Sequence, residues 1–588
     1  ITGSLTTEED AVELADGTDL QGDLILDAQI TVTGPQAKVG NYASALDISG
    51  DGWGDAVQID GQVINKGSLN ASGLMAQGIT IEYADIEGGV VNDGSITITD
   101  GIDVNDSIQE GNPSGIFIQY ANIDGHVRNN GQIKVNGNDE ADATGIQILD
   151  SDLAEADIIN SATGSIEVSG KEARGYDISQ VSIQSLLNAG SIKATALTEA
   201  LGIWLEDVTA GAVSNSGDIT ATTQAGSDAT GIKVDDSELA SLSNTGTISA
   251  SAPAGEAVGI QIDDSDIEGS LVNLGSIDVQ SGDEAIGIEL FNSNVDGLTN
   301  EGSITVTNTS NAAVTASSEA DTRGILLFGS DADGEVRNDG SIKVSGNKVA
   351  GIQILNSDLA EADIVNTGKI EADGKIAFGL DLSGVKPATV QSITNSGTIA
   401  VSASERSHGL YLDHVEASGS LNNSGSIIAT GNDARAIRLE QASIAGGIHN
   451  SGTIKGNDFG IWIGDNSVAP VHVTQSAGLL QGGQYAVQGG SGNQVSVELA
   501  GGTIGGNLAG IFKLDVTGKG IFDGDSISTV APSTGEAGKG WVDLYNSSDS
   551  PNGTAGHLVL LRPHTTLNGA LEVNTGDTVE LRLSQATH

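Results

Sequence analysis

Apolar residues recur with a period of two in short stretches along most of the chain, and turn-forming Gly, Asn, Asp and Ser residues separate the stretches. In residues 341–344, Ile342 and Val344 alternate with polar residues, and Ile352 and Ile354 repeat this pattern after a short turn. Because successive side chains of a strand point to opposite sides, each stretch predicts a strand with one apolar face.

A third, weaker apolar stretch closes each period and leads into the motif Asn-x-Gly-x-(Ile/Leu). An imperfect copy of this motif, with two inserted residues, begins at Asn160. From the first to the last start is 450 − 65 = 385 residues in thirteen intervals, or about 30 residues each, which is typical of a solenoid. We therefore predict an all-β fold, a right-handed parallel β-helix with three strands and about 28–30 residues per coil. The other motif starts are Asn65, Asn92, Asn129, Asn188, Asn215, Asn244, Asn273, Asn300, Asn338, Asn366, Asn395, Asn423 and Asn450.

In-register stacking of such coils explains the choice of residues. Coils hydrogen-bonded about 4.8 Å apart place equivalent side chains in columns. Inward columns of Ile, Val and Leu make a narrow core, in agreement with an aromatic content of only 3%. The motif Asn is expected to form an amide ladder, and the motif Gly to provide a turn with positive φ.

The coils are themselves part of a longer sequence repeat. Residues 127–135 match residues 336–344, and residues 145–160 match residues 351–366 almost letter for letter. Because Asn129 and its counterpart Asn338 are seven motifs and 209 residues apart, a block of seven coils was duplicated. We predict a regular β-helix over residues 41–470 that contains two copies, at about 65–272 and 273–470.

Charge and composition limit the classes of partner that suit this chain. The chain has 79 acidic and 24 basic residues, a net charge of -55, and no Cys. Nucleic acid and anionic membrane surfaces are therefore unsuitable partners, whereas divalent cations are suitable ones. No apolar run approaches the length of a transmembrane helix.

The two ends depart from the repeat. Residues 1–40 include a helix-like acidic stretch at 7–14, and we predict an N-terminal cap there, because an open solenoid end exposes a sheet edge. Residues 471–588 predict a less regular C-terminal β-helix with longer strands and Gly-Gly turns.

The asparagine coils, the segment at residues 495–518 and the stretch Thr-Leu-Asn-Gly-Ala-Leu-Glu-Val at residues 566–573 carry a resemblance. Together they resemble the passenger domain of a bacterial autotransporter, in the region before its outer-membrane barrel. The resemblance implies a β-helix at the outer surface of a Gram-negative cell or released from it. It leaves the activity open, because such passengers include adhesins, proteases, lipases and coat-forming proteins.

Catalytic motifs are missing from the sequence: it has no Gly-x-Ser-x-Gly elbow, His-Glu-x-x-His or phosphate-binding loop. When the sequences of the two copies are aligned, no histidine is aligned with another histidine; His408, for example, is aligned with Leu201. We interpret the histidines as residues of surface turns, and the others compared in this way are His126, His414 and His449.

Acidic columns follow the second strand of successive coils. The position five residues after the Gly that opens this strand carries Asp or Asn in four coils, beginning with Asp207, and a second acidic column lies two residues further on. Oxygen ligands in a turn suit Ca²⁺, so we expect a calcium site, with a solvated acidic turn as the alternative. The candidate ligands are Asp236, Glu238, Asp264, Asp266, Glu268, Asn292, Asn294 and Asp296.

Four aromatic residues, Phe117, Trp204, Tyr411 and Trp462, occupy the middle of second strands, where most coils carry polar residues. We expect them to be exposed and to contact sugars, a loop or another protein.

Two functions remain open. The first is a non-catalytic structural or adhesive β-helix that forms a calcium-dependent coat, S-layer-like array, biofilm component or filament. Its partners are other copies of the chain, cell-surface proteins, lipopolysaccharide or extracellular glycans. The alternative is a β-helical polysaccharide lyase or hydrolase, which a groove of Arg, Lys and carboxylates on consecutive coils would favour.

Overall fold

Each sequence period folds into three strands. In the turn that begins at Asn338, these are β34 (Ser341–Ser345), β35 (Lys348–Leu355) and β36 (Asp358–Asn366). Ile342, Val344, Ile352 and Ile354 are all at most 1% exposed, so the apolar alternation does point inward. We call the three strands of a turn the first, second and third strand.

The computed structural model is an all-β parallel β-solenoid of about 16 turns, so the predicted fold class is confirmed. Two compact units are present, one formed by residues 1–295 and 307–310 (unit 1) and one by residues 296–306 and 311–588 (unit 2). Among the described residues, no helix has the length and apolarity needed to cross a membrane. The structure describes residues 1–7, 10–34, 43–52, 56–73, 75–100, 112–224, 227–310, 321–384, 388–464, 470–490, 494–529, 541–544, 557–560, 566–568, 570–573 and 578–581.

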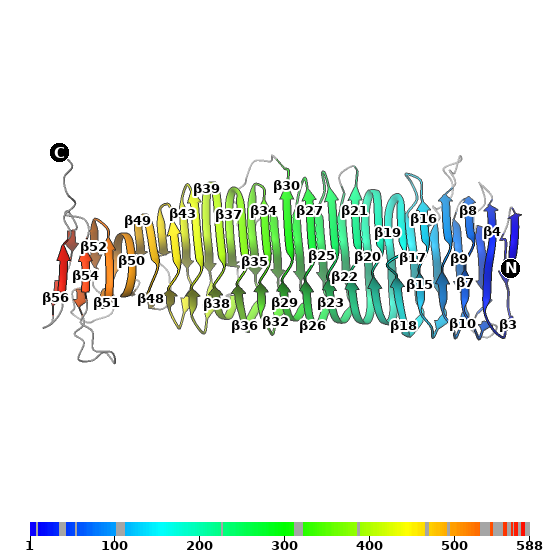
Figure 1. Cartoon of the computed structure of the whole chain (residues 1–588), viewed down its shortest axis with the longest axis horizontal. Helices are drawn as coiled ribbons and strands as arrows, with labels where there is room; N and C mark the ends of the chain where they lie inside the picture. The colour runs from blue at the N-terminus through cyan, green and yellow to red at the C-terminus, as the bar shows by residue number, and fades with distance from the viewer. Residues whose placement is uncertain are drawn as a thin grey trace. The chain divides into compact units, whose positions relative to one another are not determined.

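Within each unit, equivalent strands of successive turns lie side by side and pair in parallel (Figure 1). In unit 1 the third strands β7 (Val63–Asn65), β11 (Val90–Asn92) and β15 (Val127–Asn129) pair so that their three Asn residues are aligned. In unit 2, β33 (Val336–Asn338) and β36 keep the same alignment. In-register pairing therefore makes columns of equivalent side chains.

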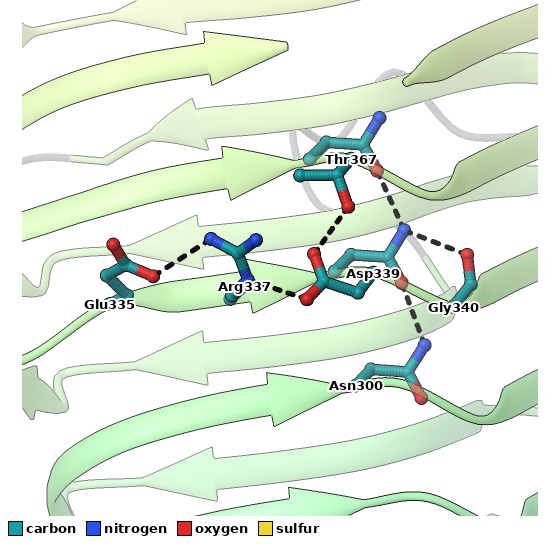
Figure 2. A network of polar contacts seen from close by, with 8 residues as sticks. Asn300, Glu335, Arg337, Asp339, Gly340 and Thr367 are labelled. Carbon is teal, nitrogen blue, oxygen red and sulfur yellow. Dashed lines mark hydrogen bonds and ion pairs between the residues drawn. The ribbon is translucent and has the colours of Figure 1, made fainter. Parts of the chain in front are cut away.

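The motif asparagines form the predicted amide ladder in both units. In unit 2, Asn300 Nδ2 donates to Asn338 Oδ1 at 2.8 Å, and Asn338 Nδ2 donates to Asn366 Oδ1 at 2.7 Å (Figure 2). The ladder continues with the same geometry through Asn395, Asn423 and Asn450. In unit 1 it runs from Asn65 to Asn273 and includes the imperfect copy at Asn160.

The ladder extends one turn beyond the last motif. Asn450 Nδ2 donates to Gln475 Oε1 at 2.7 Å, and Gln475 is fully buried. The described residues near the N-terminus also join the stack: β1 (Thr2–Thr7) pairs in parallel with β4 (Leu24–Thr33). The helix expected at residues 7–14 is wrong for the described part, because Thr7 ends β1 and Glu13–Leu14 is strand β2; residues 8 and 9 lie outside the described residues.

The motif glycines are needed for close approach and not for a left-handed turn, which corrects the sequence interpretation. Gly397 and Gly425 are not among the residues with positive φ. A Cβ on Gly397 would lie 2.1 Å from the carbonyl oxygen of Gly368, the equivalent glycine of the neighbouring turn. Because no side chain fits at that distance, stacking itself excludes other residues from this column.

Tyr176 is an exception in the aliphatic core. It lies in β19 (Ser165–Asn188), between Ile146 and Ile203 of the adjacent turns, and it is fully buried. Burial raises its pKa, and its hydroxyl has no hydrogen-bond partner among the described residues. A buried hydroxyl without a partner destabilises the folded state.

We predict that Asn395→Ala lowers the free energy of unfolding of unit 2 by about 2–4 kcal/mol, because it leaves the amide donor of Asn366 and the amide acceptor of Asn423 unpaired. Denaturant unfolding followed by circular dichroism measures the change. The control is Ser396→Ala at the exposed neighbouring position, which should change the value by less than about 0.5 kcal/mol. Equal effects of the two substitutions would show that the ladder contributes no more than a surface turn.

Tyr176→Phe should raise the stability of unit 1 by about 1 kcal/mol, since it removes an unpaired buried hydroxyl and keeps the ring. Thermal unfolding compares this variant with Tyr485→Phe, a half-buried tyrosine for which little change is expected. Loss of stability in Tyr176→Phe would mean that the hydroxyl makes a favourable contact.

Candidate functional site

The candidate site lies on the outer face of the second strands in unit 2. Two columns of side chains run along this face, one from the residue before the strand-opening Gly or Ala and one from the middle of the strand. In register, the first column contains Phe378, His408, Arg435, Phe459 and Tyr485. The second contains Gln353, Asp381, Tyr411, Arg438 and Trp462.

In the strands that carry the aromatic and arginine side chains of the two columns, the alternation of inward and outward side chains is interrupted at the Gly or Ala, because this residue and the next are both buried. The strands are β37 (Lys369–Ser383), β39 (Thr398–Asp413), β43 (Ala434–Glu440), β47 (Phe459–Ile463) and β49 (Leu479–Gly489). Residues three apart, such as Arg435 and Arg438, would lie on opposite faces of a regular strand. Here Ala436 is fully buried and both guanidinium groups contact the ring of Trp462, so the two arginines lie on the same face.

Eight residues make a continuous set of ring and guanidinium contacts, which we call the aromatic–arginine ladder. The carbon of the Arg435 guanidinium lies 4.7 Å from the centre of the Trp462 ring, and that of Arg438 lies 5.3 Å from the same ring. Arg438 also lies 4.9 Å from the ring of Tyr411. Phe459 and Tyr485 stack at 5.9 Å with an interplanar angle of 10°. The members of the ladder are Phe378, His408, Tyr411, Arg435, Arg438, Phe459, Trp462 and Tyr485.

Carboxylates neutralise the arginines of the ladder. Arg435 Nη2 lies 2.8 Å from Asp433 Oδ1, and Arg438 Nη2 pairs with Glu440. Arg406, one turn before Arg435, lies 3.6 Å from the Asp433 carboxylate. Burial lowers the pKa of Arg435, and the neighbouring Arg438 lowers it further, while Asp433 opposes the shift.

Tyr411 is held by two further carboxylate contacts. Its hydroxyl lies 3.0 Å from Asp413 Oδ2 and 3.1 Å from Glu440 Oε2, and it donates to one of them at a time. Burial raises the pKa of Tyr411, and the charges of Asp413 and Glu440 raise it further. Three arginines, three carboxylates and the Tyr411 hydroxyl are thus paired with one another in this part of the surface.

His408 is fully buried inside the ladder, so the interpretation of this histidine as a surface-turn residue is wrong. Its Nδ1 lies 2.8 Å from the carbonyl oxygen of Ser407, and its Nε2 lies 3.0 Å from Arg438 Nη1. With Nδ1 as the donor and Nε2 as the acceptor, the neutral ring satisfies both contacts. Burial, together with the charges of Arg438 and Arg435, holds its pKa well below the ordinary value. His414, by contrast, does occupy a turn, with φ of 56° and a half-buried side chain.

The four aromatic residues expected to be exposed are all half-buried. Tyr411 and Trp462 come together through Arg438, which lies between them in the column. Trp204, in unit 1, contacts the Arg174 guanidinium at 4.8 Å, and Arg174 is paired with Glu172. Phe117 lies between Thr80 and Gln147 in its column and belongs to neither cluster.

The acidic columns have a conformational explanation. Asp207, Asp236, Asp264 and Asn292 all have φ between 46° and 53°, in the left-handed region that Asp and Asn adopt more readily than most residues. Of the next column, Asn294 donates to Asp266 at 2.7 Å, and Glu238 is aligned with Asp266. Glu268 is exposed, and Asp296 belongs to unit 2. Within the described residues, no three His, Asp or Glu side chains are grouped so as to hold a metal ion, and calcium stays a prediction.

Acidic residues next to these turns do repel one another. The pKa of Asp263 is raised to about 6, chiefly by burial, and the charges of Asp235 and Asp264 add to the shift while Lys233 opposes it. The pKa of Glu206 is raised by burial and by Asp235. These shifts record a cost of placing like charges in neighbouring turns.

Sequence reasoning missed Arg435, Arg438 and His408 as members of a site. The sequence did contain a signal for them, because the two copies share their inward residues and differ at these outer positions. Seven turns earlier, the positions of His408, Arg435, Phe459 and Tyr485 are occupied by Leu201, Thr230, Val258 and Ile286, which form one column in unit 1. The positions of Arg438 and Trp462 are occupied by Lys233 and Gln261.

Residues 209–460 match the family model of the BigA third pectate lyase-like domain. The matched segment contains 460 − 209 + 1 = 252 of the 588 residues, and it includes most of the ladder. BigA is an autotransporter-like surface protein. No curated protein and no solved structure matches the chain.

Asp381, next to the ladder, makes stability depend on pH. It is fully buried, accepts a hydrogen bond of 2.7 Å from Gln353 Nε2, and has a pKa raised to about 6, chiefly by burial. The folded state binds this proton more tightly than the unfolded state. The contribution of Asp381 to the free energy of unfolding is therefore greatest at low pH and falls as pH rises from about 4 to about 6.

We predict that Asp381→Asn raises the free energy of unfolding at pH 7.5 by about 1–3 kcal/mol and flattens its decline between pH 4 and 6. Denaturant unfolding at a series of pH values measures both effects. Asp373→Asn, at an exposed position of the same strand, is the control and should leave the pH profile unchanged. A profile that is equally steep in Asp381→Asn and in the unaltered chain would contradict the assignment.

Proposed function

We propose that the chain is a non-catalytic β-helix displayed at the outer surface of a Gram-negative cell, where it has an adhesive or structural role. One observation carries this proposal: the ionisable groups of the ladder are engaged with one another. Arg435 pairs with Asp433, Arg438 pairs with Glu440, and the hydroxyl of Tyr411 lies between two carboxylates.

General acid–base catalysis requires a group that can take up or release a proton near neutral pH at a reachable position. His408 does not meet this requirement, because it is buried and its two ring nitrogens face Ser407 and Arg438. Tyr411 does not meet it either, since its pKa is raised. Such an arrangement supports recognition of a ligand and not turnover.

Surface display is supported by the family match and by the sequence resemblance. The segment 209–460 matches a domain type of BigA, an autotransporter-like surface protein, and the asparagine coils with the C-terminal stretches resemble an autotransporter passenger. We further propose that the chain takes part in cell attachment or in an ordered surface layer of many copies. A net charge of -55 makes divalent cations suitable bridges between copies in such a layer.

A polysaccharide lyase is the second candidate. Tyr411 lies on one turn and Arg435, Arg438 and Glu440 lie on the next, and the matched family model is described as pectate lyase-like. Arginine can neutralise a substrate carboxylate in a lyase. In this protein the arginines are already paired with Asp433 and Glu440, which favours the first candidate.

Display and turnover are tested together. We expect Gram-negative cells that carry the chain on their surface to attach to one another or to a coated surface more than cells without it. A calcium chelator reduces the attachment if cation bridges hold the layer. The purified chain should release no unsaturated product from polygalacturonate and no reducing ends from neutral polysaccharides.

The non-catalytic proposal is abandoned if products accumulate with the purified chain and disappear in Arg438→Lys but not in the control Asp373→Asn. Unchanged attachment of displaying and bare cells would argue against the adhesive role. A structural role would still give an ordered surface layer in electron micrographs, and a bare surface would exclude it.

A further inference from the structure

We propose that the aromatic–arginine ladder binds a neutral polysaccharide, an extended chain whose sugar rings stack on the aromatic side chains. This inference deepens the adhesive function and rests on it, because it names the ligand class of the same site. Four features of the described residues carry it: the difference between the two copies, the hydrogen-bond donors and acceptors beside the rings, the charge balance of the site and the low exposure of its arginine side chains.

The duplication provides an internal comparison. Both copies keep the inward aliphatic columns and the asparagine ladder, so the requirements of the fold are the same in each. On the outer face, however, Thr230, Val258 and Gln261 of the first copy correspond to Arg435, Phe459 and Trp462 of the second. The scaffold tolerates the simpler residues, so stacking of turns does not require the ladder.

Stability also fails to explain the ladder. The buried Nε atoms of both Arg435 and Arg438 have no hydrogen-bond partner among the described residues, and buried donors without partners destabilise a fold. Two guanidinium groups next to one indole also repel each other, and Arg438 contributes to the lowered pKa of Arg435. Residues kept at a cost to stability are expected at sites of function.

The ladder has the chemical groups that recognise a sugar. Aromatic rings offer apolar faces on which the C–H face of a pyranose packs. Trp462 and Tyr485 both stay partly exposed, although Arg435 and Arg438 lie against the Trp462 ring and Phe459 stacks on Tyr485. The paired guanidinium and carboxylate groups beside the rings supply donors and acceptors for sugar hydroxyls. Because Asp433 and Glu440 already hold the arginines in place, little side-chain freedom is lost on binding.

The charge balance selects a neutral ligand. Arg406, Arg435 and Arg438 are offset by Asp413, Asp433 and Glu440, and Asp381, beside Tyr411 in the second column, adds a further carboxylate, so the site has no excess of positive charge to attract an anionic ligand. The chain as a whole carries a net charge of -55, which repels polyanions at long range. A polyuronate or a sulfated glycan would therefore meet an unfavourable field and no unpaired arginine.

The low exposure of the arginine side chains favours a thin, extended ligand. Their side chains are only 14% exposed in Arg435 and 16% exposed in Arg438. Because rings cover much of each guanidinium group, the accessible groups follow one another from turn to turn along the column, as the units of a single extended polysaccharide chain do. A second copy of the chain is disfavoured as the occupant by its own negative charge.

The test is affinity electrophoresis of the whole chain in native gels that contain a glucan, a mannan, a galactan or polygalacturonate. We expect at least one neutral polysaccharide to retard the chain and polygalacturonate to have no effect. A variant that places first-copy residues in the ladder should bind at least about tenfold more weakly, since it loses ring stacking and two cation–π contacts. Its substitutions are Arg435→Thr, Arg438→Lys, Phe459→Val and Trp462→Gln.

The reciprocal variant is the matched control, because it puts ladder residues on the corresponding turns of unit 1. It should gain affinity for the same polysaccharide even when the ladder in unit 2 has been removed. Circular dichroism and unfolding transitions verify that both variants are folded. The substitutions are Leu201→His, Thr230→Arg, Lys233→Arg, Val258→Phe and Gln261→Trp.

Several results would overturn the inference: no retardation by any of the neutral polysaccharides, binding that survives removal of the ladder, or tighter binding of polygalacturonate. Self-association that depends on the ladder, without retardation by a glycan, would assign the face to a second copy instead. If cells still attach but the chain binds no glycan, the glycan-binding inference is wrong and the adhesive function stands. If the chain binds a glycan but cells do not attach, the adhesive function is wrong and the glycan-binding site stands.

Discussion

In-register pairing of parallel strands between successive turns is the constraint on which the rest of the structure depends. It fixes neighbouring backbones at hydrogen-bonding distance and therefore places each side chain directly against its counterpart in the next turn. The asparagine ladder is one consequence, because an amide has a donor and an acceptor and can pair with an identical amide on each side. A glycine column that leaves no space for a Cβ is another.

Columns of equal charge are the difficulty in such a fold. In unit 1, burial raises the pKa of Glu206 and of Asp263 near the turns after the second strands, and neighbouring carboxylates add to both shifts. In unit 2, Arg438 lies between the rings of Tyr411 and Trp462 in the column. Glu440 of the same strand neutralises Arg438, and Asp433, in the turn before that strand, neutralises Arg435. This arrangement spares the column a row of like charges and creates an aromatic surface.

The inward columns restrict the core to aliphatic residues, and the outer face is not restricted in this way. After duplication, the two copies could therefore keep one scaffold and differ at the surface. That freedom explains why the ladder occurs in one copy and why a matched set of simpler residues exists in the other. A protein built in this way can change its outer face without a change of fold.

The amino-acid sequence by itself determined the three strands of each turn, the inward Ile and Val columns, the asparagine ladder and the duplication. These follow from a period of two within a strand and a repeat of about 30 residues between turns, and both can be read locally. It also located Tyr411 and Trp462, although it placed them in solvent.

Only the tertiary structure decided which outer side chains meet. Arg435 and Arg438 share a face because Ala436 and Ile437 are both buried, which interrupts the alternation that the sequence pattern assumes. His408 is buried because Phe378, Tyr411 and Arg438 from three different turns surround it. The motif Gly and the Asp and Asn of the acidic turns were explained only by backbone geometry, by close approach in the first case and by positive φ in the second. Contacts between turns join residues that are far apart in sequence, so a pattern within one strand does not contain them.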